Sequence, residues 1–444
     1  MNTSQILFSL AVALFAGLFL SRVVKPLKLP AVTGYLIAGV LIGPFCLGAL
    51  GITGAFSSTE SLGSMAKIVE DAALGFIAFA IGTEFKLASL KKTGRQAMVV
   101  GCAQAFITMI VVDAVLIALH FVLGPDVLPL SVAITLGAIA TATAPAATMM
   151  VVKQYKAKGP LTSLLLPVVA LDDAVGLVCF AVSIGVAQAV QNGAESLSLI
   201  SVVLNPLLEV ILSLLLGAVM GYIFSVTEDL FKSNSKRLCI SITFVLLSIA
   251  ISQQKFHLPY GIEIGFSTLL VCMMLGTLFC NICDSADELM ERTDKWTMPI
   301  YILFFVISGA QLDFTIFASI AVIGVGATYV LSRALGKYFG AGLSARIVKC
   351  EPSIVKYLGI TLFPQAGVAI GMSLLAVGLL GGETGNMVRN IVLFGVLIYE
   401  LVGPLLTKIA LTKAGDITPK KEEAVHHQTL AEAFADEPDE DDIK

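Results

Sequence analysis

The stretch LLLPVVALDDAVGLVCFAVSIG, residues 164–185, places two adjacent carboxylates, Asp172 and Asp173, in the centre of an apolar run. A carboxylate at the middle of a membrane helix costs about 2.5–3.5 kcal/mol on insertion scales. A helix with only a structural role would not be expected to contain two such carboxylates. The pair is therefore the first candidate for a functional site, and the rest of the chain shows what kind of fold holds it.

The composition is that of a polytopic membrane protein. The chain has 444 residues, of which 57% are hydrophobic and 14% are charged, and its mean hydropathy is +0.91. Soluble domains carry about 25% charged residues. The eight cysteines and four histidines form no metal-ligand or catalytic pattern, and no nucleophile set or phosphate loop is present. We expect an all-α protein in a lipid bilayer that is not an enzyme, holds no cofactor and binds no nucleic acid.

Thirteen apolar runs are long enough to cross a bilayer, for which a helix needs about 20 residues. They are 5–23, 30–50, 65–85, 96–123, 129–152, 161–191, 201–226, 236–253, 262–281, 298–314, 315–338, 353–380 and 389–411. Lysine and arginine gather in alternate loops, whereas the opposite loops hold only Lys67, Lys255 and Arg389. By the positive-inside rule, this asymmetry predicts thirteen spans in the plasma (inner) membrane, with the N-terminus outside and the C-terminus cytoplasmic.

The order of the runs predicts the domain organisation. Residues 1–412 form one transmembrane domain, and 413–444 are an acidic, polar stretch that we expect to be a disordered cytosolic tail. If the run 201–226 is a linker helix, residues 1–191 and 236–412 are two six-helix repeats of opposite orientation.

Two runs contain segments that break a helix. The fifth run contains GAIATATAPAATMM, where Pro145 removes a backbone donor beside three threonines, and the twelfth contains ITLFPQAGVAIGMS with Gln365. Each is the fifth helix of its half. Discontinuous helices at corresponding positions of inverted repeats point to the binding site of a transporter, and Asp172 and Asp173 follow the first break on the next helix. Adjacent helical residues point about 100° apart, so the two carboxylates are expected to have separate roles.

At this point the sequence resembles the cation/proton antiporter superfamily, and within it the second branch, the sodium/proton exchangers with an Asp-Asp pair. The resemblance extends over essentially all spans. It rests on LPAVTGYLIAGVLIGP (29–44), LGFIAFAIGTEFKLASLKK (74–92), TATAPAA, ALDDAVG, FFVISGAQLDF (304–314) and YVLSRALGKYFGA (329–341).

The resemblance implies a homodimer with a static dimerisation domain and a mobile core domain, and an elevator-like alternating access. It implies that Asp173 binds the ion and that Asp172 pairs with a basic residue on the eleventh span, where Arg333 matches best and Lys337, one turn on, is the runner-up. Gln365 stands where many relatives have arginine. Relatives that export potassium have a Gln-Asp pair and a nucleotide-binding domain, both absent here, and no separate regulatory subunit is evident.

The chemistry of the site fits a sodium ion. Sodium is a hard cation that prefers oxygen ligands, and the Asp173 carboxylate with the Thr141 and Thr143 hydroxyls would supply them. A carboxylate out of water can hold a proton or a sodium ion, but not both, and only the neutralised form crosses an apolar barrier readily. If Asp172 also carries a proton, two protons exchange for one sodium ion; if Arg333 keeps it ionised, the exchange is one for one.

Other polar residues have less specific interpretations. Glu84 either supports the site or forms an ion pair with Arg333 that stabilises the core. Asp113, Glu209 and Glu400 also lie in apolar runs, where such acids more often pair across helix interfaces or reach the headgroups. The sequence thus predicts a secondary active sodium/proton antiporter. The alternatives are a potassium/proton antiporter of the same fold and a sodium-coupled symporter of an organic anion, which the adjacent Asp-Asp pair disfavours.

Overall fold

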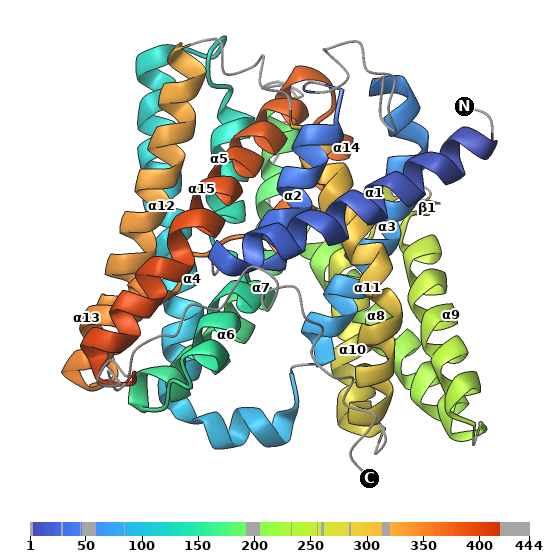
Figure 1. Cartoon of the computed structure of the whole chain (residues 1–444). Helices are drawn as coiled ribbons and strands as arrows, with labels where there is room; N and C mark the ends of the chain where they lie inside the picture. Colours follow the sequence, from blue (N-terminus) through green and yellow to red (C-terminus); the bar gives the residue numbers. More distant parts are fainter. Residues whose placement is uncertain are drawn as a thin grey trace.

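The computed structural model describes residues 3–27, 30–44, 46, 59–83, 85–191, 205–231, 233–254, 256–258, 262–283, 286–312 and 320–417. These residues form fifteen α-helices, one short 3-10 helix (Lys25–Leu27) and two short strands (Figure 1). The first seven helices are α1 (Thr3–Val24), α2 (Ala31–Ile42), α3 (Thr59–Thr83), α4 (Leu87–Leu123), α5 (Leu130–Ile139), α6 (Pro145–Gln154) and α7 (Pro160–Gln191). The others are α8 (Asn205–Asp229), α9 (Asn234–Ser252), α10 (Thr268–Ile282), α11 (Ala286–Ala310), α12 (Ile320–Ile347), α13 (Pro352–Thr361), α14 (Gly367–Leu380) and α15 (Gly382–Ala414).

Each predicted apolar run overlaps a helix, and the fifth and twelfth runs hold two helices each. Within the described residues, six helices are long and apolar enough to cross a membrane, namely Gln5–Val24, Gly94–Leu123, Pro160–Gln191, Leu208–Asp229, Asn234–Ser252 and Gly382–Ala414. The chain is therefore a multi-pass membrane protein, while the count of thirteen spans stays a prediction.

Two sequence boundaries need correction. Residues 262–264, assigned to the ninth span, form the strand β2 (Ile262–Ile264), which pairs antiparallel with β1 (Phe256–Leu258) before α10 begins at Thr268. The all-α prediction did not include this hairpin. At the other end, α15 continues to Ala414, and Asp416 and Ile417 are buried. The folded part therefore extends beyond the predicted boundary at 413, and residues 418–444 lie outside the described part.

The helices pack mainly within two sets. In one set α12 packs against α4 and α13, α7 against α4 and α5, and α15 against α13 and α14. In the other α2 packs against α1 and α11, and α10 against α3 and α8. Figure 1 shows α12, α13, α4 and α15 on one side and α9, α10, α8 and α11 on the other. Contacts between the sets are fewer; the most extensive joins α7 and α8, and others join α2 with α15 and α3 with α14.

Close helix contacts in the second set depend on glycine. A Cβ added at Gly39 of α2 would lie 1.9 Å from the carbonyl oxygen of Val306 on α11, and one at Gly309 would lie 2.2 Å from that of Leu36. Small residues let membrane helices approach closely in this way, where van der Waals packing replaces the hydrophobic effect as the main attraction. Any side chain at these two positions would push α2 and α11 apart.

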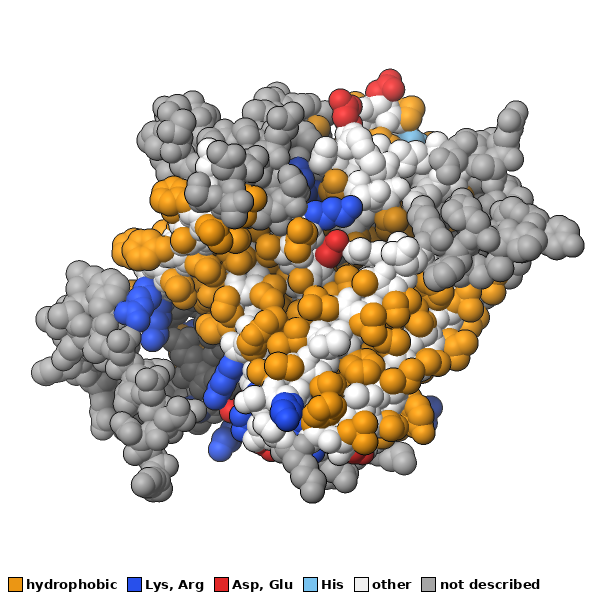
Figure 2. All heavy atoms as spheres, turned by 90° about the vertical axis from the view of Figure 1, so that its right-hand side faces the viewer, with side chains coloured by type: hydrophobic (Ala, Val, Ile, Leu, Met, Phe, Trp, Pro, Cys, Tyr) orange, Lys and Arg blue, Asp and Glu red, His pale blue; other side chains and the backbone are white. Residues whose placement is uncertain are grey.

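One face of the molecule is largely apolar in its middle. Figure 2 shows hydrophobic side chains across the middle of the face that lies at the right of Figure 1. Exposed large hydrophobic residues on α8 include Leu215, Val219 and Tyr222, with exposed fractions of 60%, 49% and 58%. Such a continuous apolar surface on a protein of this composition fits burial in lipid.

Candidate ion-binding site

Both predicted helix interruptions are confirmed. α5 ends at Ile139 and α6 begins at Pro145, while α13 ends at Thr361 and α14 begins at Gly367. Pro145 therefore starts a helix, a position where its missing N–H is an orphan donor anyway, and it does not merely kink a continuous one.

The two interruptions contact one another. The Ala144 N–H donates to the Pro364 carbonyl at 2.9 Å, and the Gln365 amide donates to the Ile139 carbonyl at 3.1 Å. Backbone groups freed by the broken helices are thus partly satisfied across the crossing, which is what irregular backbone at membrane depth requires. Gln365, predicted as a supporting residue, binds the end of α5.

Arg333 on α12 binds the carbonyl groups of both interruptions. Its guanidinium donates to the carbonyl oxygens of Ala140 at 3.0 Å, Ala142 at 2.7 Å and Phe363 at 2.8 Å, and it is fully buried. The C-terminal ends of α5 and α13 carry partial negative charge, which a cation at that place offsets. The preference of the sequence analysis for Arg333 as the partner of Asp172 was therefore wrong, because this side chain serves the backbone.

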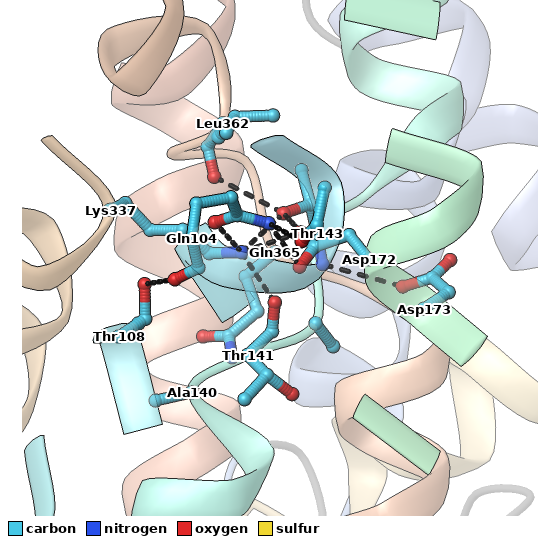
Figure 3. Close-up of polar contacts among 12 residues, drawn as sticks. Gln104, Thr108, Ala140, Thr141, Thr143, Asp172, Asp173, Lys337, Leu362 and Gln365 are labelled. Carbon is cyan, nitrogen blue, oxygen red and sulfur yellow. Dashed lines mark hydrogen bonds and ion pairs between the residues drawn. The ribbon is translucent and has the colours of Figure 1, made fainter. Parts of the chain in front are cut away.

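Lys337, the runner-up, pairs with Asp172. Its Nζ lies 2.5 Å from Asp172 Oδ2, and both side chains are completely buried. The ammonium also donates to Thr143 Oγ1 at 2.9 Å and to the Thr141 carbonyl. Such an ion pair tolerates burial only when further hydrogen bonds satisfy it, and here the first interruption supplies them (Figure 3).

Gln104 on α4 completes the surroundings of Asp172. Its amide nitrogen donates to Asp172 Oδ1 at 2.5 Å, and its amide oxygen accepts from Lys337 Nζ at 3.3 Å. The Thr108 hydroxyl in turn donates to the Gln104 backbone carbonyl at 2.7 Å. Sequence reasoning missed Gln104, although one signal was available, because a lone amide inside the apolar run 96–123 is as exceptional as a lone acid.

Asp173 points away from the ion pair, toward another side of α7 (Figure 3). Its carboxylate is buried, with 1% exposed, and its Oδ1 lies 3.4 Å from the Thr143 backbone nitrogen, which donates to it. The Thr143 hydroxyl meanwhile donates to Asp172. Thr143 therefore contacts both carboxylates, one through its main chain and one through its side chain.

The predicted sodium ligands are partly brought together. Thr143 lies between the two carboxylates, whereas the Thr141 hydroxyl donates to the Ala138 carbonyl at 2.7 Å. Thr141 nevertheless faces α7, since a Cβ added at Gly176, one turn after Asp173, would lie 2.6 Å from Thr141 Oγ1. Glu84 lies outside the described residues.

The site combines charges that nearly balance. Lys337 pairs with Asp172, Arg333 binds carbonyl oxygens of the interruptions, and Asp173 accepts from the Thr143 N–H. Among the described residues, no group of three or more His, Cys, Asp or Glu could hold a metal ion tightly. Carboxylate, hydroxyl and carbonyl oxygens are the ligand types that a hard monovalent cation prefers.

Comparisons with known proteins identify a family and similar structures. Residues 10–413 match the profile of a family described as the transmembrane sodium/hydrogen exchanger. The structure of the sodium proton antiporter MjNhaP1 from Methanocaldococcus jannaschii at pH 8 is similar, with a TM-score of 0.73 and 18% identity over 93% of this chain and 99% of that one. An electron-microscopy structure of the same antiporter gives 0.70 and 17%, over 95% and 100%. At such identities the likeness shows a common fold. No curated protein compared with the chain matches it.

Proposed function

Because the chain belongs to the sodium/hydrogen exchanger family, we propose that it is a secondary active antiporter in which sodium ions and protons compete for Asp173. The proposal rests on the different surroundings of the two adjacent acids. Lys337 neutralises Asp172, whereas Asp173 lies beside the interrupted helix with the Thr143 N–H at 3.4 Å. Asp172 is thus paired with a cation, and we propose Asp173 as the carboxylate that binds the transported ion.

Competition between sodium ions and protons for Asp173 would account for the exchange of one ion for the other. A bare carboxylate moving through an apolar barrier is costly, whereas a carboxylate carrying a proton or sodium ion is nearly neutral. We propose that the forms in which Asp173 holds a proton or a sodium ion move, and that the form with a bare Asp173 carboxylate does not. Sodium would be bound by Asp173 with oxygens of the interruption, including those of Thr141 and Thr143.

Lys337 supplies a second proton in this proposal. Thr143 contacts both carboxylates, so a sodium ion bound at Asp173 is placed to draw Asp172 into its ligand set. Lys337 would then lose its counter-charge, and a buried ammonium without one is strongly disfavoured relative to the neutral amine. Its proton would leave as sodium binds, which makes the exchange two protons for one sodium ion and therefore electrogenic.

The access change is proposed to be an elevator-like movement of one helix set against the other. The sparse contacts between the sets, and the presence of both interruptions and both acids in the set of α4–α7 and α12–α15, support this view. The set of α1–α3 and α8–α11 would be the static part, and with it a homodimer interface. The N-terminus would lie outside and the C-terminus inside the cell.

The test of the ion site is sodium-driven proton movement in proteoliposomes. Asp173→Asn keeps the shape and hydrogen-bonding capacity of the side chain but cannot be ionised, and we expect it to abolish the movement. Asp126→Asn, which changes an exposed loop acid, is the matched control and is expected to behave as wild type. Full exchange by Asp173→Asn would refute the ion site, and a response of wild type to potassium in place of sodium would favour the potassium/proton alternative.

The stoichiometry has its own test, the electrical current produced by a sodium gradient on a solid-supported membrane. Wild type is expected to give a current, and Lys337→Gln to exchange without one, because the neutral amide can still bind Asp172 but carries no proton. An undiminished current in Lys337→Gln would exclude Lys337 as a proton carrier.

A further inference from the structure

Glu400 on α15 is a buried acid that the exchange site does not use. Its side chain is 1% exposed, and its Oε2 accepts a long hydrogen bond of 3.4 Å from the Thr33 hydroxyl on α2. Its other oxygen, Oε1, is buried and has no hydrogen-bond partner among the described residues. Within the same part of the chain, no lysine or arginine lies within ion-pair distance of it.

Two other buried acids, which lie in ion pairs, have much stronger partners than Glu400. Asp172 binds Lys337 at 2.5 Å, and the fully buried Glu228 binds Arg237 at 2.9 Å. An ionised carboxylate with only one long hydrogen bond would cost several kcal/mol in this apolar setting. A neutral carboxylic acid costs far less, because only a polar group is buried. The surroundings of Glu400 therefore favour the neutral, protonated acid over the carboxylate.

The charged groups on the helices around α15 do not change this conclusion. Helices α2, α5 and α14 contain no charged residue. On α12, Lys337 pairs with Asp172, and Arg333 binds backbone carbonyls and lies over the Tyr399 ring, 4.5 Å from its centroid.

The charged side chains described on the other helices around α15 also have partners elsewhere. On α13, Lys356 lies over the Tyr357 ring, with its Nζ 5.4 Å from the centroid. On α7, Asp172 and Asp173 belong to the ion site. The side chain of Lys153 on α6 lies outside the described part.

The contact between Glu400 and Thr33 crosses the boundary between the two helix sets. α2 belongs to one set and α15 to the other. Beside the contact lies an apolar gap, lined by Leu36, Leu393, Leu397 and their neighbours, that is too narrow to hold a water molecule. This gap therefore offers no room for a water molecule that could hydrate Glu400 from that side.

Glu400 is also close to the crossing of the interrupted helices. One turn further along α15, a Cβ added at Gly403 would lie 2.8 Å from Pro364 Cγ, so α15 packs tightly against the second interruption. Pro404 lacks an N–H, which removes the helical hydrogen-bond donor for the Glu400 carbonyl and weakens α15 at this point. The stretch of α15 that carries Glu400 therefore contacts both α2 and the second interruption.

We propose that Glu400 is a second proton-binding site, separate from Asp172 and Asp173, which holds a proton while α15 lies against α2 and releases it when the two helices separate. The separation step rests on the alternating access proposed above, whereas the bound proton does not. By linkage, protonation of Glu400 stabilises the packed arrangement as much as packing stabilises the proton. Alkaline conditions would therefore favour separation.

Infrared spectroscopy of the purified protein at neutral pH tests the bound proton directly. Wild type is expected to show a carbonyl stretching band of a protonated carboxylic acid that is missing in Glu400→Gln, an uncharged substitution of the same shape. The control Glu383→Gln changes an exposed acid on the same helix and is expected to leave the band intact. The same band in Glu400→Gln as in wild type would overturn the proposal, whether or not the protein exchanges sodium.

The pH dependence of exchange tests the release. Glu400→Gln is permanently neutral, so its exchange rate is expected to match wild type under acidic conditions and to fall several-fold below it under alkaline conditions, where wild-type Glu400 loses its proton on separation. Identical pH profiles for the two proteins would overturn the release step. Absence of exchange in wild type would instead refute the proposed antiport and leave the infrared result to decide the bound proton.

Discussion

Arg333 is predicted to hold the crossing of the two interrupted helices together, and its removal tests that role. The guanidinium donates three hydrogen bonds of 2.7–3.0 Å to carbonyls of both interruptions. Hydrogen bonds to a charged group contribute about 1.5–3 kcal/mol each, and a buried carbonyl left unsatisfied adds a further penalty. Three neighbouring bonds are not additive, so we expect Arg333→Leu to lower the free energy of unfolding by about 5 kcal/mol. Arg333→Lys keeps the charge but not the planar fork, and should lose roughly half as much.

The assay is chemical unfolding of the purified protein in detergent, followed by circular dichroism. Arg346→Leu is the matched control, because Arg346 lies on the same helix, in its last turn, and is exposed. We expect this control to stay close to wild type, as surface substitutions usually do. If Arg333→Leu were as stable as Arg346→Leu, the reasoning about the carbonyl groups would be wrong.

Two further predictions follow from close contacts in the same helix set. Gly176→Ala would place a Cβ 2.6 Å from Thr141 Oγ1, so we expect a several-fold higher sodium KM in the proteoliposome assay, whereas Gly378→Ala, which enters open space, should leave KM unchanged. Equal KM values would show that Thr141 has no part in sodium binding. Asp416 accepts hydrogen bonds from the Thr162 N–H at 2.6 Å and hydroxyl at 2.8 Å and so caps the start of α7. Asp416→Ala should therefore lower the free energy of unfolding by about 1–2 kcal/mol in the detergent assay, and wild-type stability would contradict the capping role.

The interruptions were predictable from sequence because their causes are local. Proline lacks a donor wherever it stands, so Pro145 marked the first break, and Pro364 with Gly367, three residues later, marked the second. The Asp172–Asp173 pair was equally visible, because two acids in an apolar run have few structural explanations. Both features can be recognised without knowing how the helices pack.

The partner of Asp172 was not predictable, because it depends on how α12 is placed against α4. Arg333 and Lys337 lie one turn apart on the same side of α12, and sequence spacing does not say which of them meets the acid. Gly336 lets α12 approach α4 closely, because a Cβ at this position would lie only 3.0 Å from the Thr108 Cα. That close approach places Lys337 beside Gln104 and leaves Arg333 for the interruptions.

The boundary errors have a different origin. Hydropathy does not separate the strand at 262–264 from the helix that follows, because both are apolar. Asp416 is held in the folded part by its hydrogen bond to the start of α7. No local pattern in a polar, charged segment predicts such a contact.

Equilibrium sodium binding at several pH values tests the central claim most directly, and it does so without any assumption about movement. If sodium and protons compete for Asp173, the apparent Kd for sodium of the detergent-purified protein should rise as the pH falls, by up to about tenfold per pH unit for each proton displaced. Asp173→Asn should show no sodium binding at any pH. A sodium Kd that does not change with pH, or unchanged sodium binding by Asp173→Asn, would contradict the account.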